Sequence, residues 1–217
     1  MALCSRFPTA ALFLAGAMAA PAQQSAPIVQ PGAPGQASKL LNEATVQPPY
    51  RAPFKADVEF MQGMIMHHQQ AVDMVALLRT RGKSPTLRSF GEKIAISQSD
   101  EIRSMKQWLE SRGKPTSMEM DHSHMSAADM KNMNMLMPGM LTPEQMTALA
   151  KARGAQFDHL FLTGMIQHHG GALTMVDELF QTPGAAQDPV LFDFATDIDA
   201  TQSAEIKIMR EMLKEKP

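Results

Sequence analysis

Histidine and methionine side chains recur in the same pattern at two places in the chain. The segments Met64–His68 and Met165–His169 each begin with a methionine and end in two adjacent histidines. A thioether is neutral, polarizable and cannot be protonated in water, so it favours soft Cu(I) or Ag(I), whereas imidazole binds copper in either oxidation state. The residue types therefore predict a site for copper, or for the similar ion silver.

Thiolates do not contribute to this prediction. The chain has one cysteine against 20 methionines, and Cys4 lies within residues 1–22, which resemble a secretory signal peptide. Arg6 supplies its positive start, Ala10–Ala20 its apolar run, and the end at Ala22 an A-x-A cleavage site. The run is shorter than the roughly 20 residues of a spanning helix, which argues against the alternative of an uncleaved membrane anchor. We expect cleavage near Ala22, a periplasmic or secreted location, and no membrane contact afterwards.

The two histidine pairs belong to an internal repeat. Residues 57–74 align with residues 158–175, and the stretch Gln98–Leu109 aligns with Gln202–Leu213. Apolar residues in all four segments recur at helical spacing and do not alternate, so each segment is predicted to be an amphipathic helix. Short turns make the two helices of each copy antiparallel. The sequence therefore predicts an all-α fold, a four-helix bundle built from two repeated helical hairpins.

Start and stop signals divide the rest of the chain. Residues 23–53 are rich in Pro, Gly and Gln without a hydrophobic period, and are predicted to form a flexible leader. The first hairpin occupies residues 54–112, a Met/His-rich linker residues 113–141, and a short helix plus the second hairpin residues 142–217. The boundary signals are Gly82, Ser84-Pro85, Gly113, Thr142-Pro143, Gly154 and Asp188-Pro189.

Helical geometry decides which side chains share a face. At about 100° per residue, Met61, Met64 and His68 share one narrow face, and His67 and Met74 lie on its flank. The second copy repeats this arrangement with a leucine in place of Met61. The candidate metal ligands of the whole chain are Met61, Met64, His67, His68, Met74, Met105, Met118, Met120, His122, His124, Met125, Met165, His168, His169, Met175 and Met209.

The linker is the strongest compositional signal. From Met118 to Met140 it carries methionines and histidines among Asp and Asn residues, with no helical stripe. As packed structure, this stretch would expose apolar patches without a buried face. We interpret it as a tether that captures a soft metal ion, with residues 122–125 able to wrap one ion; a hydrophobic interaction loop is the alternative.

Each candidate also has an ordinary structural role. A methionine at a core position such as Met61 usually packs, and its burial is worth roughly 1.5–3 kcal/mol. A buried histidine needs a partner, which either a metal or a hydrogen bond supplies, and His67 and His168 also suit a solvated edge. Glu101 and Glu205 could face the histidine helices or stay solvated.

Two further features have simple structural interpretations. Asp57 and Asp158 lie near helix starts, where capping is the expected role of a carboxylate. The pair Gly170-Gly171 weakens a helix by about 1 kcal/mol per residue relative to alanine, and close approach of another helix is the interpretation we prefer.

These motifs resemble those of the DUF305 family, a ferritin-like helical group. The resemblance covers about residues 54–111 and 140–214. It implies a ferritin-like bundle and, from characterised members, copper binding in copper tolerance. Leu162 and Met212 stand where the first copy has Met61 and Trp108, which argues against two fully symmetric sites. The matching signatures are Phe60-Met61-x-x-Met64-Ile65-x-His67-His68-x-x-Ala71-x-x-Met74, its copy Phe161–Met175, and Gln98-x-x-Glu101-Ile102-x-x-Met105-x-x-Trp108-Leu109.

We expect an exported copper-binding protein that buffers the metal or passes it to a transfer partner. The net charge of −2 gives no basic field that would attract nucleic acid. One alternative is a metal-dependent oxidase, including a cuprous oxidase, but the inward Glu-x-x-His pairs of di-iron bundles are absent from the four repeat helices. A metal-free helical interaction module is the other. We favour a binding protein over an enzyme.

Overall fold

The structure is a computed structural model that describes residues 28–41, 52–118 and 136–214. The chain divides into two compact units, Met1–Tyr50 and Arg51–Pro217. The candidate ligands Met120, His122, His124 and Met125 lie outside the described residues, as does the expected signal peptide. The remaining candidates all belong to the second unit.

The first unit contains a two-stranded antiparallel hairpin. Strand β1 (Ile28–Gln30) pairs with β2 (Lys39–Leu41), with Ile28 opposite Leu41. Gly35 occupies the turn with a φ of 85°, a conformation that glycine adopts without steric strain. The prediction of a flexible leader missed this element, because strands of three residues carry too little periodicity to be recognised.

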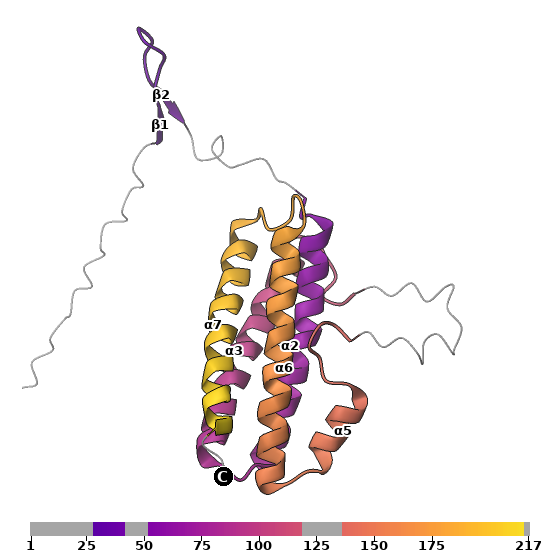
Figure 1. Cartoon of the computed structure of the whole chain (residues 1–217). Coiled ribbons are helices and arrows are strands. Elements are labelled where there is room, and N and C mark those ends of the chain that lie inside the picture. The colour runs from indigo at the N-terminus through magenta and orange to yellow at the C-terminus, as the bar shows by residue number, and fades with distance from the viewer. Residues whose placement is uncertain (1–27, 42–51, 119–135, 215–217) are drawn as a thin grey trace, which may run out of the picture. The chain divides into compact units, whose positions relative to one another are not determined.

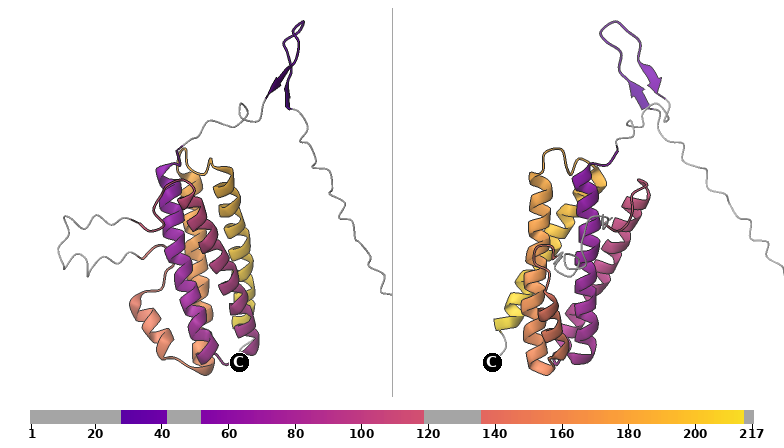
Figure 2. Two further views of the ribbon diagram at one scale, coloured as in Figure 1. Left: turned by 180° about the vertical axis from the view of Figure 1, so that it is seen from behind. Right: turned by 90° about the vertical axis from the view of Figure 1, so that its right-hand side faces the viewer.

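Four long helices form the second unit (Figure 1). They are α2 (Lys55–Arg81), α3 (Pro85–Glu110), α6 (Gly154–Gln181) and α7 (Pro189–Lys214). Helix α2 packs on α3, α6 packs on α7, and the two hairpins meet through α2 and α6. The short helix α5 (Pro143–Lys151) lies on the outside of the bundle against α6 and α2 (Figure 2). The predicted all-α fold is therefore confirmed.

Local signals set the helix ends as predicted. The Ser84 side chain accepts a hydrogen bond from the Leu87 amide at the start of α3. Thr142 and Gln145 form a reciprocal capping box at the start of α5. Gly154 has a φ of 63° where the chain turns from α5 into α6, a backbone conformation that disfavours any residue with a Cβ.

Each hairpin has one buried carboxylate that hydrogen-bonds to the turn of the other hairpin. Asp57 of α2 accepts a hydrogen bond from the amide of Ala186, in the turn between α6 and α7. Asp158 of α6 accepts bonds from the amides of Lys83 and Ser84, in the turn between α2 and α3. These carboxylates were expected to cap helices near their own positions, and these bonds instead satisfy backbone donors of the opposite hairpin.

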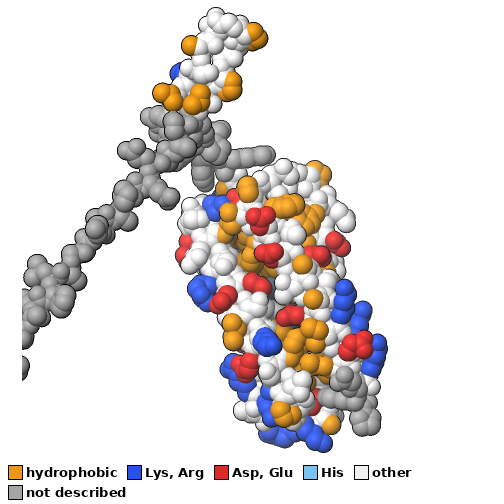
Figure 3. Space-filling model, turned by 90° about the vertical axis from the view of Figure 1, so that its left-hand side faces the viewer, with side chains coloured by type: hydrophobic (Ala, Val, Ile, Leu, Met, Phe, Trp, Pro, Cys, Tyr) orange, Lys and Arg blue, Asp and Glu red, His pale blue; other side chains and the backbone are white. Residues whose placement is uncertain are grey.

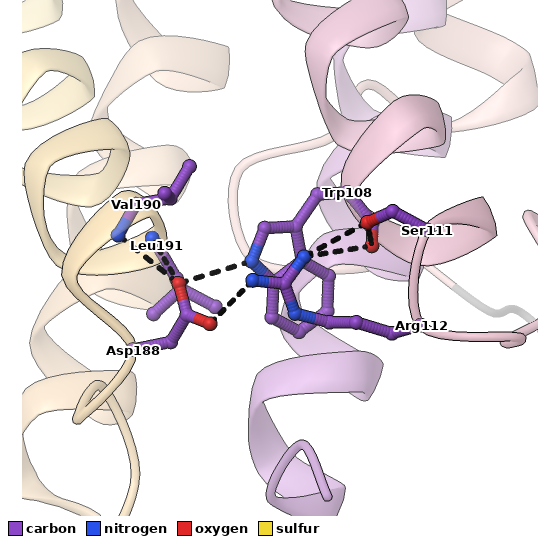
Figure 4. A network of polar contacts seen from close by, with 6 residues as sticks. All are labelled: Trp108, Ser111, Arg112, Asp188, Val190 and Leu191. Carbon is purple, nitrogen blue, oxygen red and sulfur yellow. Dashed lines mark hydrogen bonds and ion pairs between the residues drawn. The ribbon is translucent and has the colours of Figure 1, made fainter. Parts of the chain in front are cut away.

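Asp188 connects the end of the first hairpin to the start of the last helix (Figure 4). Its carboxylate accepts hydrogen bonds from the amides of Val190 and Leu191, and thereby caps α7. The same carboxylate accepts a bond from the Trp108 indole N–H at 3.2 Å and pairs with the guanidinium of Arg112. That guanidinium lies 4.2 Å from the centre of the Trp108 ring, in a cation–π contact. Asp188 thus caps α7 and bonds both members of this contact.

Replacing Asp188 with alanine should lower the free energy of unfolding by about 2 kcal/mol. Loss of the cap costs about 1 kcal/mol, and the indole and guanidinium of the first hairpin lose their partner as well. Urea denaturation followed by circular dichroism measures the change. The exposed Asp193 on the same helix is the control, and its replacement by alanine should stay within about 0.5 kcal/mol of the parent.

The core consists of two apolar clusters separated along the bundle. One cluster joins the N-terminal half of α2 to the C-terminal half of α6, and includes Met64 and Met105. The other joins the opposite halves of the same helices, and includes Met165 and Met209. Between the two clusters, each long helix contributes polar side chains: the histidine pairs on α2 and α6, and Gln98, Glu101, Gln202 and Glu205 on α3 and α7.

The face of the molecule in Figure 3 carries charges of both signs. On the face of the molecule in Figure 3, acidic and basic side chains are interspersed and the apolar ones lie in small groups. Among the described residues, no helix is long and apolar enough to cross a membrane.

Candidate metal centre

The two histidine pairs meet in the middle of the bundle, where all four side chains are completely buried. The ring of His67 lies against the ring of His168 from the other hairpin, with centroids 3.8 Å apart. Within each hairpin the adjacent rings are farther apart, 6.4 Å between His67 and His68 and 6.1 Å between His168 and His169. The possibility that His67 and His168 form a solvated edge is therefore excluded.

Each of these imidazoles uses its Nε2 atom in a hydrogen bond. The Nε2 of His68 lies 2.6 Å from a carboxylate oxygen of Glu101, and that of His169 lies 2.7 Å from Glu205. The Nε2 of His67 faces the carbonyl oxygen of Pro138 at 2.9 Å, and that of His168 faces the carbonyl oxygen of His67 at 2.8 Å. A carbonyl oxygen only accepts, so Nε2 carries the proton in His67 and His168.

Among the described residues, the other ring nitrogen of each of these four histidines has no hydrogen-bond partner. Within the described part of the chain, all four Nδ1 atoms are buried without a hydrogen bond. The amide nitrogen and oxygen of Gln98 and Gln202 are likewise buried and unpaired. Such groups are rare in folded proteins, because each one costs about 1–3 kcal/mol when it is left unsatisfied. A layer with this many unsatisfied polar atoms can bind a further ligand.

Burial keeps the central rings neutral. Desolvation is the largest influence on His67 and lowers its pKa from 6.5 to about 3, although the bond to Pro138 acts in the opposite direction. Burial also lowers the pKa of His168 well below its usual value, and the nearby His67 ring reinforces the shift. With Nε2 protonated and the ring neutral, Nδ1 of each presents a lone pair, which is the form that binds a metal.

The glutamates orient the outer rings. Burial acts to raise the pKa of Glu101, but the bonds from His68 and Ser97 outweigh it and hold the pKa below its usual value. The Glu101 carboxylate is therefore ionised and accepts a hydrogen bond from the Nε2–H of His68. A carboxylate that holds the far nitrogen of an imidazole is the usual outer partner of a metal-binding histidine. Glu205 holds His169 in the same way from α7.

The methionines on the candidate list occupy several environments. Met61, Met64, Met74, Met105, Met165 and Met209 are at most 1% exposed and belong to the two apolar clusters. Met64 and Met105 border the histidine layer on one side, and Met165 and Met209 border it on the other. Met175 is 8% exposed and, with the half-buried Met118, lines a hollow on the outside of the bundle.

Sequence reasoning left several residues of the layer off the candidate list. Glu101 and Glu205 were weighed as neighbours of the histidines but not included as part of the site. Gln98 and Gln202 precede them by one helical turn and repeat in both hairpins, which is the signal that could have identified them. The carbonyl oxygen of Pro138 carried no signal, because any residue supplies a carbonyl.

The donors do not form a preassembled cage for a hard ion. Across residues 28–41, 52–118 and 136–214, no group of three or more His, Cys, Asp or Glu side chains is placed to hold a metal. The layer instead offers separate imidazole nitrogens, bordered by thioethers. This donor set suits an ion that accepts few, soft ligands.

Comparison with known proteins identifies the family. The model of the family described as "Domain of unknown function (DUF305)" matches residues 57–213. The chain belongs to the DUF305 family. A crystal structure of a DUF305 protein from Streptomyces coelicolor, described as secreted, is 30% identical and has a TM-score of 0.62; the match covers 74% of this chain and 93% of that one.

Other DUF305-like structures carry metal ions. The protein CopM is 28% identical in its Cu(I)-bound form, with a TM-score of 0.55 over 73% of this chain and 95% of CopM. CopM has also been crystallised with Cu(II) and with silver. An uncharacterized protein of Acanthamoeba polyphaga mimivirus is 36% identical over 59 residues, a match that spans 39% of that protein and 27% of this chain.

Proposed function

We propose that the protein is an exported binding protein for Cu(I), and for Ag(I) as its close mimic, which acts in metal buffering, transfer or tolerance. The observation that carries the proposal is the set of four buried Nδ1 atoms without partners, on imidazoles whose Nε2 atoms are already held. The structural likeness to CopM, which has been crystallised with both ions, supports the same conclusion.

The spacing of adjacent rings supports a two-coordinate ion. Metal–imidazole bonds are about 2 Å long, so an ion bonded to two rings in line holds the ring centres about 6 Å apart once the ring radii are added. The separations within the two pairs, 6.4 Å and 6.1 Å, match this value. Monovalent copper and silver accept so few ligands, whereas harder divalent ions require more of them.

The surroundings favour a monovalent ion as well. The penalty for moving an ion from water into an apolar interior rises with the square of its charge. Met64, Met105, Met165 and Met209 enclose the layer with polarizable groups that can approach a soft ion without adding charge. Glu101 and Glu205 do not bind the ion themselves. Their negative charge acts on it through His68 and His169, to which they are hydrogen-bonded.

Replacing both His68 and His169 with alanine should lower the affinity for Ag(I) and Cu(I) by about 100-fold or more at the buried site. The milder pair of changes Glu101→Gln and Glu205→Gln should lower it by about 10- to 100-fold, as is usual for outer partners of metal-binding histidines. Competition titration against a chromophoric Cu(I) chelator measures both effects.

His159 provides the matched control for this titration. It lies exposed on α6, nine residues before His168 and outside the layer. Its replacement by alanine should leave metal binding unchanged. The proposal fails if the His68 and His169 variant keeps the affinity and stoichiometry of the parent. Oxygen consumption on addition of Cu(I), measured in parallel, would instead favour an oxidase.

A further inference from the structure

A second group of sulfur donors gathers outside the histidine layer, on the surface of α2. An added Cβ at Gly63 would lie 3.1 Å from the Cε of Met118, 3.1 Å from the Sδ of Met137 and 3.4 Å from the Cε of Met175. The ends of three methionine side chains therefore converge on one point above this glycine. They come from three separate parts of the chain: the segment after α3, the segment before α5, and helix α6.

The backbone near two of these methionines is fixed by side chains of α2. The Gln62 amide donates to the carbonyl oxygens of Pro115 and Ser117, which places Met118 beside α2. His67 bonds the carbonyl oxygen of Pro138, which places the neighbouring Met137. Both segments are thus attached to α2 on either side of Gly63, so specific hydrogen bonds bring the ends of these methionine side chains together.

The place where the three methionine side chains end is hollow and open to solvent. Met118, Met137 and Met175 line a cavity of about 240 Å³, together with Gly63 and the exposed carboxylates of Glu59 and Glu178. Met118 and Met137 are half-buried, which leaves their thioethers accessible from outside. Glu59 is ion-paired with Lys55, and Glu178 adds a further negative charge beside the hollow, which attracts cations.

The second hairpin contains an internal comparison. Gly164 is the repeat equivalent of Gly63, and its notch is closed by the side chains of Leu141 and Met74. Leu141 is 3% exposed, so one leucine is enough to seal this notch by packing. The Gly63 notch has two linker methionines in place of that leucine and remains hollow. Packing alone does not account for this difference.

We propose that Met118, Met137 and Met175 form a second, solvent-facing site for Cu(I) or Ag(I), distinct from the buried histidines. Thioether sulfur is a soft ligand that selects Cu(I) over harder ions. The missing Cβ at Gly63 leaves the room in which the three sulfurs approach one ion. This site deepens the proposed function and rests on it, since it assigns a first point of contact for the same ions.

Two variants test the site by different routes. The triple change Met118→Leu, Met137→Leu and Met175→Leu keeps the apolar volume but removes the sulfurs, and should lose one bound Ag(I). Gly63→Ala keeps every donor but forces the three side chains apart, and should weaken that Ag(I) about tenfold or more. Alanine also favours the helix, and circular dichroism of this variant checks that a loss of binding does not reflect unfolding.

The measurement is a titration of the purified full chain with silver nitrate. Bound equivalents are counted by mass spectrometry under non-denaturing conditions, and Met methyl signals are followed by NMR after 13C-methyl labelling. The control is Met146→Leu with Met212→Leu, two half-buried methionines that do not line the hollow, and it should bind as the parent does.

The outcomes separate this site from the buried one. Loss of one equivalent in the triple variant, with weaker binding by Gly63→Ala, supports the surface site. If both variants bind as many ions as tightly as the parent, the surface site is overturned, while a loss caused by His68→Ala with His169→Ala still upholds the proposed function. If the parent chain itself binds no Ag(I), both proposals fail.

Discussion

Replacing Gly171 with alanine should destabilise the protein by about 3 kcal/mol, whereas the same change at Gly170 should stabilise it by about 1 kcal/mol. A Cβ at position 171 would lie 1.8 Å from the carbonyl oxygen of Pro138 and 2.5 Å from the Cα of Gly139. At position 170 nothing lies within 4 Å. Alanine favours a helix over glycine equally at both positions, so the difference between the variants isolates the contact with the loop.

Urea denaturation of the two variants measures this difference. Gly171→Ala should also weaken Ag(I) binding, because a displaced loop removes Pro138 from the Nε2 of His67, 2.9 Å away. Gly170→Ala should bind silver as the parent does. Equal stabilities for the two variants would contradict the close packing of this loop against α6.

The glycine pair illustrates what sequence reasoning reached and what it did not. The cost of two glycines within a helix correctly pointed to a close approach, but the approaching element was expected to be a helix. The structure places the backbone of Pro138 and Gly139 there, and only Gly171 is in contact. Which segment covers a helix depends on how the linker folds back, and no local pattern encodes that.

The same difference between local signals and tertiary contacts holds for the rest of the described residues. Helix starts such as Ser84 and Thr142 were predicted, because a cap and the amides it satisfies are neighbours in sequence. The partners of Asp57 and Asp158 were not, because they lie in the turn of the opposite hairpin. The two-fold repeat places these two carboxylates at equivalent positions, but it does not encode which turn each one contacts.

The histidine layer shows this limit most clearly. Angles along a helix left His67 and His168 between a buried and a solvated position. Their burial follows from contact with each other across the hairpins and from carbonyl partners distant in sequence. The tertiary packing thus decides which nitrogen of each ring is hydrogen-bonded and which is left without a hydrogen bond among the described residues.

Acidification should destabilise the metal-free protein well before its carboxylates titrate. In the unfolded chain the histidines have a pKa near 6.5, whereas burial lowers the pKa of His67 to about 3 and that of His168 well below its usual value. Between these limits the unfolded chain binds protons that the folded chain does not. Stability from this source is therefore complete above about pH 6.5 and is lost as the pH falls towards 3.

The expected loss is about 2 kcal/mol for His67 by pH 5, and His168 adds a loss in the same direction. Glu101 adds its own loss only below the unfolded-state pKa of about 4.5, so the interval from pH 7 to pH 5 isolates the histidines. Urea denaturation across this interval should show a steep decline for the parent. The variant His67→Gln with His168→Gln keeps an amide donor near each carbonyl oxygen but cannot titrate, so its decline should be smaller by about 2 kcal/mol or more. Parallel declines would mean that the two rings are protonated inside the folded protein, and that their Nδ1 lone pairs are not kept free for a metal ion at mildly acid pH.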